Sequence, residues 1–129
     1  MHLASKICES IAWVDNKIVI TALLEDSSAV SWYVRPKTLP PNEERQETMA
    51  IQAQLITSIV RNNENYLGSV GFTMIRQEMA EVFLFPVHGK RRRVFCVVVA
   101  RPQTGTALWP RLPAFWQEIE RKNKSPWFL

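Results

Sequence analysis

The stretch 68–100, GSVGFTMIRQEMAEVFLFPVHGKRRRVFCVVVA, decides the fold of this chain. Its apolar segments predict three consecutive strands, at 68–76, 80–87 and 92–100. The segments EVFLFPV (81–87) and VFCVVVA (94–100) are almost continuously apolar, which is typical of strands that are covered on both faces. Gly89 marks the turn between them. The stretch therefore predicts an antiparallel meander with two strands in the middle of a sheet.

The residues before this stretch predict a helix, a hairpin and a second, longer helix. An amphipathic segment at 3–13 indicates the first helix, and 17–24 (KIVITALL) and 29–34 (AVSWYV) indicate two strands. Pro36 ends the second of these strands because it lacks the amide donor that a ladder needs. The next segment, 42–61, predicts the longest helix, with a capping asparagine and acidic residues in its first turn.

The chain closes with a further helical segment at 106–122, in which Pro113 is placed to start the helix. The expected order is α-β-β-α-β-β-β-α, an α/β (α+β) fold in which five antiparallel strands form one sheet with helices on both faces. A length of 129 residues suits one domain, and we assign 1–124 to it and 125–129 to a short aromatic tail. Trp116 should pack against the sheet, whereas the tail either packs there as well or docks into a partner.

The composition indicates a soluble, cytoplasmic protein. The net charge is +4, which is a small basic surplus. Cys8 and Cys96 lie in apolar patterns without CxxC spacing, and no signal peptide is recognisable, so we expect free thiols in a reducing compartment. The apolar runs are far too short to cross a bilayer, and we expect no membrane partner.

No group of residues in the sequence suggests catalysis, a cofactor or a metal. No serine lies in a nucleophile elbow, and 68–71 (GSVG) opens a strand rather than a helix, unlike a phosphate-binding loop. His88 cannot complete a zinc site, since the only other histidine is His2 and both cysteines belong to core patterns. Glu78 and Glu81 flank a turn and should be hydrated. We therefore expect a protein that is not an enzyme and binds no cofactor.

A basic block lies at the tip between the last two predicted strands and consists of Lys90, Arg91, Arg92 and Arg93. Clustered guanidinium groups bind phosphate well, so the block is a candidate contact for an anion or an acidic partner. The alternative is a solvated turn whose charges keep the hairpin soluble. No RNA-binding signature accompanies the block, so nucleic acid is not the expected partner, and weak nucleic-acid binding through 90–93 is kept as an alternative function.

Three stretches carry a resemblance to a known group of domains: LPPNEER (39–45), LGSV (67–70) and EVFLFPV (81–87). Together with the order of elements, they resemble the roadblock/longin (profilin-like) domains and, more narrowly, a small family of archaeal roadblock-like proteins. The resemblance implies the sheet order 2-1-5-4-3, with the first and last helices on one face and the long helix on the other. It also implies a homodimer and a role as a scaffold or regulator of small GTPases, without catalysis of its own.

In that order the third strand lies at an edge of the sheet, where unpaired backbone groups invite a second copy. Roadblock domains pair through this strand and the long helix. The candidate dimer surface here is Met49, Ala53, Ile56, Val70, Phe72, Met74 and Arg76. The alternative is a helix stripe that is buried only against its own sheet.

A ligand sensor is the alternative from another class of function. PAS and GAF modules also place helices over an antiparallel sheet, and an aromatic-lined pocket could hold a small molecule. A sizeable apolar cavity against the sheet would favour the sensor, and a filled core would favour an interaction domain. The leading expectation is a non-catalytic, homodimeric interaction or scaffold domain whose partner is a small GTPase or another signalling protein.

Overall fold

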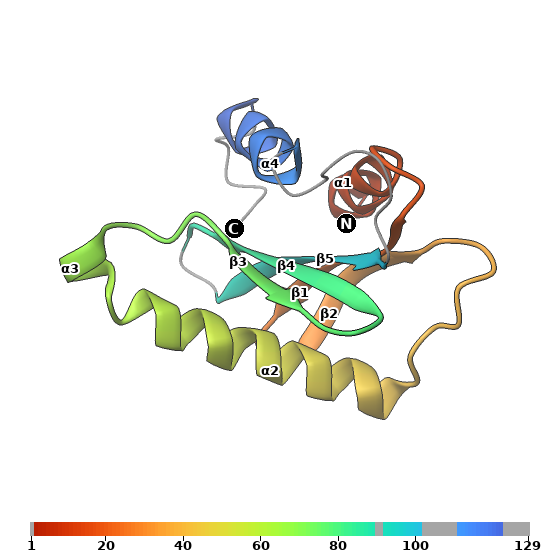
Figure 1. Ribbon diagram of the computed structural model, residues 1–129, viewed down its shortest axis with the longest axis horizontal. Coiled ribbons are helices and arrows are strands. Elements are labelled where there is room, and N and C mark those ends of the chain that lie inside the picture. Colours follow the sequence, from red (N-terminus) through yellow and green to blue (C-terminus); the bar gives the residue numbers. More distant parts are fainter. Residues whose placement is uncertain (1, 90–91, 102–110, 123–129) are drawn as a thin grey trace.

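The computed structural model describes residues 2–89, 92–101 and 111–122, which form one sheet between two layers of helix (Figure 1). The helices are α1 (His2–Ala12), α2 (Glu43–Arg61), the short α3 (Glu64–Leu67) and α4 (Arg111–Lys122). The strands are β1 (Ile18–Glu25), β2 (Ser28–Val34), β3 (Thr73–Arg76), β4 (Ala80–Val87) and β5 (Arg93–Ala100). Helices α1 and α4 cover one face of the sheet, and α2 covers the other (Figure 1).

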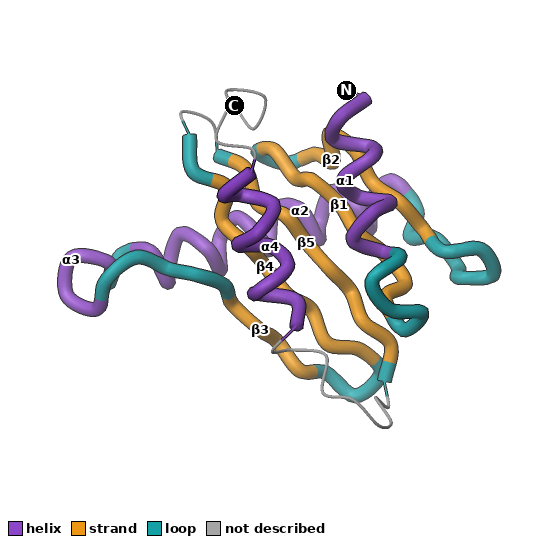
Figure 2. The backbone as a smooth tube through the Cα atoms, turned by 90° about the horizontal axis from the view of Figure 1, so that it is seen from above, coloured by secondary structure: helices purple, strands orange, loops and turns teal. Residues whose placement is uncertain are grey.

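The five strands are antiparallel neighbours in the order β2-β1-β5-β4-β3 (Figure 2). β5 lies in the middle, where Cys96 is opposite Ala22 of β1 on one side and Leu84 of β4 on the other. The two nearly continuous apolar segments are thus the strands with a layer of helix on each face. The predicted fold class, sheet order and distribution of the helices are confirmed.

The face under α1 and α4 holds an aromatic core. Phe83, Phe85 and Phe95 are almost fully buried there. Trp116 of α4 lies over two of these rings, with centroid distances of 4.9 Å to Phe95 and 5.4 Å to Phe85. Such ring pairs stabilise the fold beyond the area that they bury. The prediction that Trp116 packs against the sheet is confirmed.

Arg35, directly after β2, fastens the end of α1 to the sheet. Its Nε donates to the carbonyl of Ile18 at 2.7 Å, and its Nη2 donates to the carbonyls of Ala12 and, at 3.2 Å, Asp15. The guanidinium also lies 5.2 Å from the centroid of the Trp13 ring. A helix ends with carbonyls that have no partner inside the helix, and Arg35 supplies one.

The face under α2 is packed with smaller side chains. The buried residues of α2 are Ala50, Ala53, Gln54 and Thr57. Opposite them lies a sheet surface that includes Ala22, Leu84 and Cys96. Ile56 of α2, which is partly buried, also packs against this cluster.

The third strand is shorter than the sequence prediction, because β3 begins at Thr73 and not at residue 68. Thr73 pairs with Leu84, so that continuing the ladder by two residues would set Gly71 opposite Pro86. The carbonyl of Ala80 accepts a hydrogen bond from the amide of Gln77, so the backbone polar groups of Ala80 point toward β3. In an antiparallel strand the backbone groups of every second residue point to the same side, and Pro86 is one of these residues. Proline has no amide hydrogen to donate, and the ladder stops before it.

The residues that were expected to begin this strand, 68–72, form a connection from α3 instead. The amide of Val70 donates to the carboxylate of Glu64 at 2.9 Å, which ties this segment to α3 and not to β4. Gly68 ends α3 with a φ of +92°, a conformation that favours glycine. Phe72 already follows the sheet, with its ring centroid 5.9 Å from that of Phe85.

Glu81 and the last helix also differ from expectation. Glu81 is almost fully buried and accepts from Arg76 Nε at 2.7 Å, so the prediction of a hydrated glutamate is wrong. Helix α4 begins at Arg111, with Pro113 in its first turn. Residues 106–110 of the predicted helix and the aromatic tail 125–129 lie outside the described residues.

Candidate functional site

The outer face of α2 carries a stripe of exposed apolar side chains. Ile51, Leu55 and Ile59 are spaced four residues apart, which places them on one side of the helix. Their exposed fractions are 41%, 56% and 64%. Single exposed apolar residues are normal on a protein surface, but an aligned set on one helix indicates a contact surface. We call these three residues the α2 stripe.

Local interactions hold α2 in place at both ends. Asn42 caps the helix by accepting from the amide of Arg45 at 2.7 Å. At the other end, Arg61 pairs with Glu64 at 3.3 Å. The amide of Val70, and secondarily Arg61, lowers the pKa of the Glu64 carboxyl. The α2 stripe is therefore presented on a helix whose two ends are fixed.

β3 forms an edge of the sheet, since it pairs only with β4 among the described strands (Figure 2). Met74 and Arg76 are exposed on it. The pair that Arg76 makes with Glu81 joins the last residue of β3 to β4. This edge is four residues long and carries one charged side chain, so it offers a second chain only a short ladder.

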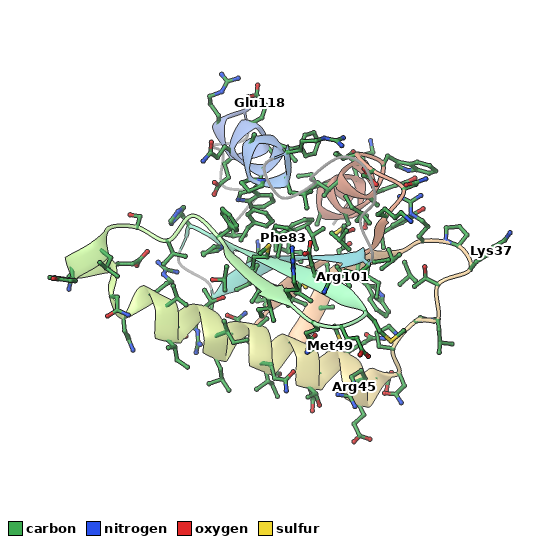
Figure 3. All side chains as sticks on the ribbon, in the orientation of Figure 1. Lys37, Arg45, Met49, Phe83, Arg101 and Glu118 are labelled. Carbon is green, nitrogen blue, oxygen red and sulfur yellow. The ribbon has the colours of Figure 1, made fainter. Side chains whose placement is uncertain are left out.

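A cavity of about 400 Å³ lies between α2 and the sheet. Figure 3 shows Met49 on the side of α2 that faces the sheet, with Phe83 on the opposite face of the strands. The cavity is bounded by Met49, Gln52, Ala53, Leu55, Ile56, Ile75, Gln77, Val82, Leu84 and Cys96. Apolar side chains dominate this lining, and the two glutamines are exposed to solvent. An apolar cavity against the sheet is the feature expected of a ligand sensor, whereas a filled core is the feature expected of an interaction domain.

No protein-family model matches the sequence, and no curated protein matches it significantly. The structure, however, superimposes on the roadblock/LC7 domain from Streptomyces avermitilis with a TM-score of 0.67 over 92% of this chain and 94% of that chain, at 14% sequence identity. The chain has the roadblock/LC7 fold. The gliding protein MglB from Thermus thermophilus matches with a TM-score of 0.67 at 11% identity over 94% of this chain and 90% of that chain. An MglB described as having a tetrameric arrangement gives 0.67 at 12% identity over the same shares of the two chains.

Within this roadblock fold, the residues predicted for a dimer surface fall into three places. Ala53 is buried beneath α2, and Met49 and Ile56 are partly buried beside the cavity. Phe72 packs on the aromatic core, and Val70 lies in the connection from α3. Met74 and Arg76, at the edge of β3, are exposed.

The helical spacing in the sequence also placed Ile59 in the apolar stripe of this helix, with Leu55 widening it, but it missed Ile51. The signal for the α2 stripe was present as the spacing Ile51, Leu55, Ile59, one turn after another. α2 carries two apolar sets, and only the packing of the helix shows which of them faces the sheet. The alanines at 50 and 53 settle this, because they allow the closest approach of the helix.

The basic tip, 90–93, is only partly described. Lys90 and Arg91 lie outside the described residues. Arg92 Nη2 donates to Ser58 Oγ at 2.9 Å and is otherwise exposed. Arg93 pairs with Glu25 through Nε at 2.8 Å, and both side chains are largely buried. Arg93 therefore joins β5 to the β1–β2 hairpin, and an anion contact remains a proposal for the rest of the block.

The described residues bring together neither a set of metal ligands nor a thiol with a lowered pKa. No set of three histidine, cysteine, aspartate or glutamate residues comes close enough to hold a metal ion in the described parts of the chain. Burial raises the pKa of Cys96 to about 12 and also raises that of Cys8, so both thiols stay protonated. His88 is exposed beside Gly89. None of the helices in the described ranges is long and apolar enough to span a membrane.

Proposed function

We propose that this roadblock-fold domain is a non-catalytic homodimer that offers a binding surface to a second protein. The observation that carries the proposal is the α2 stripe, which leaves Ile51, Leu55 and Ile59 in water on one side of a fixed helix. Apolar surface arranged in this way gains free energy when it is covered, at roughly 25 cal/mol per Å².

A dimer with two-fold symmetry would bury the α2 stripe and the edge of the sheet in the same interface. An axis beside α2 sets the two stripes against one another, antiparallel, and brings the β3 edges near each other. Such an interface is isologous and closes after two copies. Because β3 is four residues long, the helix contributes most of the contact and Met74 and Arg76 contribute at its border.

A small GTPase or another signalling protein is the proposed partner. The proposal follows from the roadblock fold, whose domains serve as scaffolds and regulators. The similar MglB described as a tetrameric arrangement is in keeping with self-association as a property of proteins with this fold. The dimer would present two copies of every exposed residue, which suits a platform that gathers partners.

The homodimer is tested by sedimentation equilibrium of the purified chain and of Leu55→Glu. We expect twice the mass of one chain for the wild type and the mass of one chain for the variant, because a buried, unpaired carboxylate is costly. Arg45→Glu is the matched control, since it adds the same side chain to the exposed first turn of α2 and should leave the dimer intact. A wild-type monomer, or a Leu55→Glu dimer, contradicts the proposal.

The partner is tested by affinity capture from the native cell extract. A small GTPase or signalling protein should be recovered with the wild type and with Arg45→Glu, and identified by mass spectrometry. Capture of neither class by the folded dimer would remove this part of the proposal and leave the dimer unaffected.

A further inference from the structure

The cavity under α2 is more than a packing defect. Small-molecule pockets typically measure about 300–1,000 Å³, and the cavity under α2 is open to solvent on one side, so a ligand could enter it. The cavity here measures about 400 Å³. We propose that it binds an elongated, uncharged apolar molecule and that the homodimer closes over its mouth. The second half of this statement rests on the proposed function, and the first half does not.

The volume follows from the sequence of α2. Ala50, Ala53 and Thr57 are buried on the helix, and their short side chains leave room beside them. Leu55 and Ile56, larger residues of the same helix, border this space without filling it. Side chains that reached further into it would stabilise the fold by about 0.8 kcal/mol per buried CH₂ group, so leaving the space open lowers stability.

A second hollow extends the shape of the site. It measures about 30 Å³, lies toward β2, and includes Trp32 and Pro41 in its lining. Met49 and Cys96 line both hollows, so they stand at the boundary between them. Methionine is unbranched and adapts its shape easily. The two hollows adjoin along the seam between helix and sheet, which suits an elongated molecule.

The lining also defines the charge of the ligand. Neither hollow has a charged side chain among its described lining residues. An ionised carboxylate or phosphate inside would be left without a partner, which is very costly in an apolar site. The amides of Gln52 and Gln77 border the main cavity and are exposed, so they can hydrogen-bond a hydroxyl or amide at the end of the molecule.

Leu55 connects this site to the dimer. It lines the cavity and also belongs to the α2 stripe, with 56% of its surface exposed. A second copy seated on the stripe covers Leu55 and therefore the side of the cavity that is open to water. Ligand binding and dimerisation then strengthen each other by the same factor, as thermodynamic linkage requires.

The site is tested on the full chain with aminoanthracene, an uncharged apolar fluorophore whose emission rises in dry surroundings. We expect saturable binding to the wild type and competition by decanol at least about tenfold stronger than by decanoate, because the carboxylate must be desolvated. Ala53→Leu and Ile75→Phe each add volume into the cavity and should abolish binding. Met79→Ser, at an exposed residue away from the cavity, should leave it unchanged.

Two further results separate the halves of the proposal. A saturating concentration of the fluorophore should lower the dissociation constant of the dimer by about tenfold. A monomer that binds the fluorophore upholds the cavity site and removes both the closure and the proposed homodimer. A dimer without saturable binding, or binding that survives in both cavity-filling variants with a folded circular dichroism spectrum, overturns the ligand site.

Discussion

Replacing Arg35 by methionine should detach the end of α1 without disturbing the sheet. The guanidinium donates to the carbonyls of Ala12, Asp15 and Ile18 and lies over the ring of Trp13. Methionine keeps most of the aliphatic stem, so the variant removes the polar head alone. Ala12 and Ile18 are fully buried residues, so water replaces the lost donors poorly.

The expected loss is about 3.5 kcal/mol of unfolding free energy, the sum of the contributions that follow. A hydrogen bond from a charged donor contributes about 1.5–3 kcal/mol, and we take the lower end for the two bonds to buried residues. The contact with the exposed Trp13 adds about 0.5 kcal/mol. For a domain of this size the loss corresponds to a decrease of roughly 10 °C in melting temperature.

Urea unfolding followed by tryptophan fluorescence and by circular dichroism measures the effect. All samples are compared at one protein concentration, because dimerisation would add to the apparent stability. Arg35→Lys keeps the charge but not the planar fork of donors, and should recover less than half of the loss. Arg45→Met, at an exposed position, should stay within about 0.5 kcal/mol of the wild type. If Arg35→Met also stays within that range, α1 is held by its apolar face alone and the role given to Arg35 is refuted.

Three further predictions concern the core, the thiols and the response to acid. Phe83→Ala should cost about 3–5 kcal/mol in urea unfolding and Val98→Ala less, because phenylalanine leaves the larger cavity; unchanged midpoints in both would show that β4 and β5 are not central. Cys8 and Cys96 are buried, and burial raises the pKa of both, the latter to about 12, so a disulfide reagent at pH 8 should react slowly with the native protein and quickly in denaturant. Fast native labelling would contradict this placement. The pKa of Glu64 is lowered from 4.5 by a backbone amide, so its charged form stabilises the fold at pH values above 4.5, and that contribution is lost as the pH falls through the lower native value. Glu64→Gln should therefore be less stable than the wild type at pH 7 and equal to it in strong acid; an equal difference at both pH values would rule out the linkage.

The elements could be predicted from the sequence because each has a local signal. The apolar runs at 81–87 and 94–100, the cap at Asn42 and the stop at Pro36 depend on neighbouring residues alone. The sheet order was an implication of the resemblance to roadblock domains, and the structure has the same order. Local signals thus sufficed for most of the elements, though not for α3 or for the start of β3, and family likeness for their arrangement.

The differences arose where distant residues decide. Pairing of Arg93 with Glu25 joins residues that are 68 positions apart, and nothing in the basic run indicates it. The orientation of α2 depends on which of its two apolar sets fits the sheet, so the α2 stripe could not be assigned before the packing was known. The short β3 did have a signal in Pro86, but its effect depends on the register against β4.

Pro86 also limits how chains of this protein can aggregate. An open strand edge can nucleate filaments, because each added chain presents a fresh edge to the next. Here the ladder beyond β3 is blocked where the proline lacks a donor, and a template of four residues is too short to hold an incoming strand by backbone bonds alone. Pro86, which lies in one of the two nearly continuous apolar strands, therefore limits polymerisation from this side of the sheet.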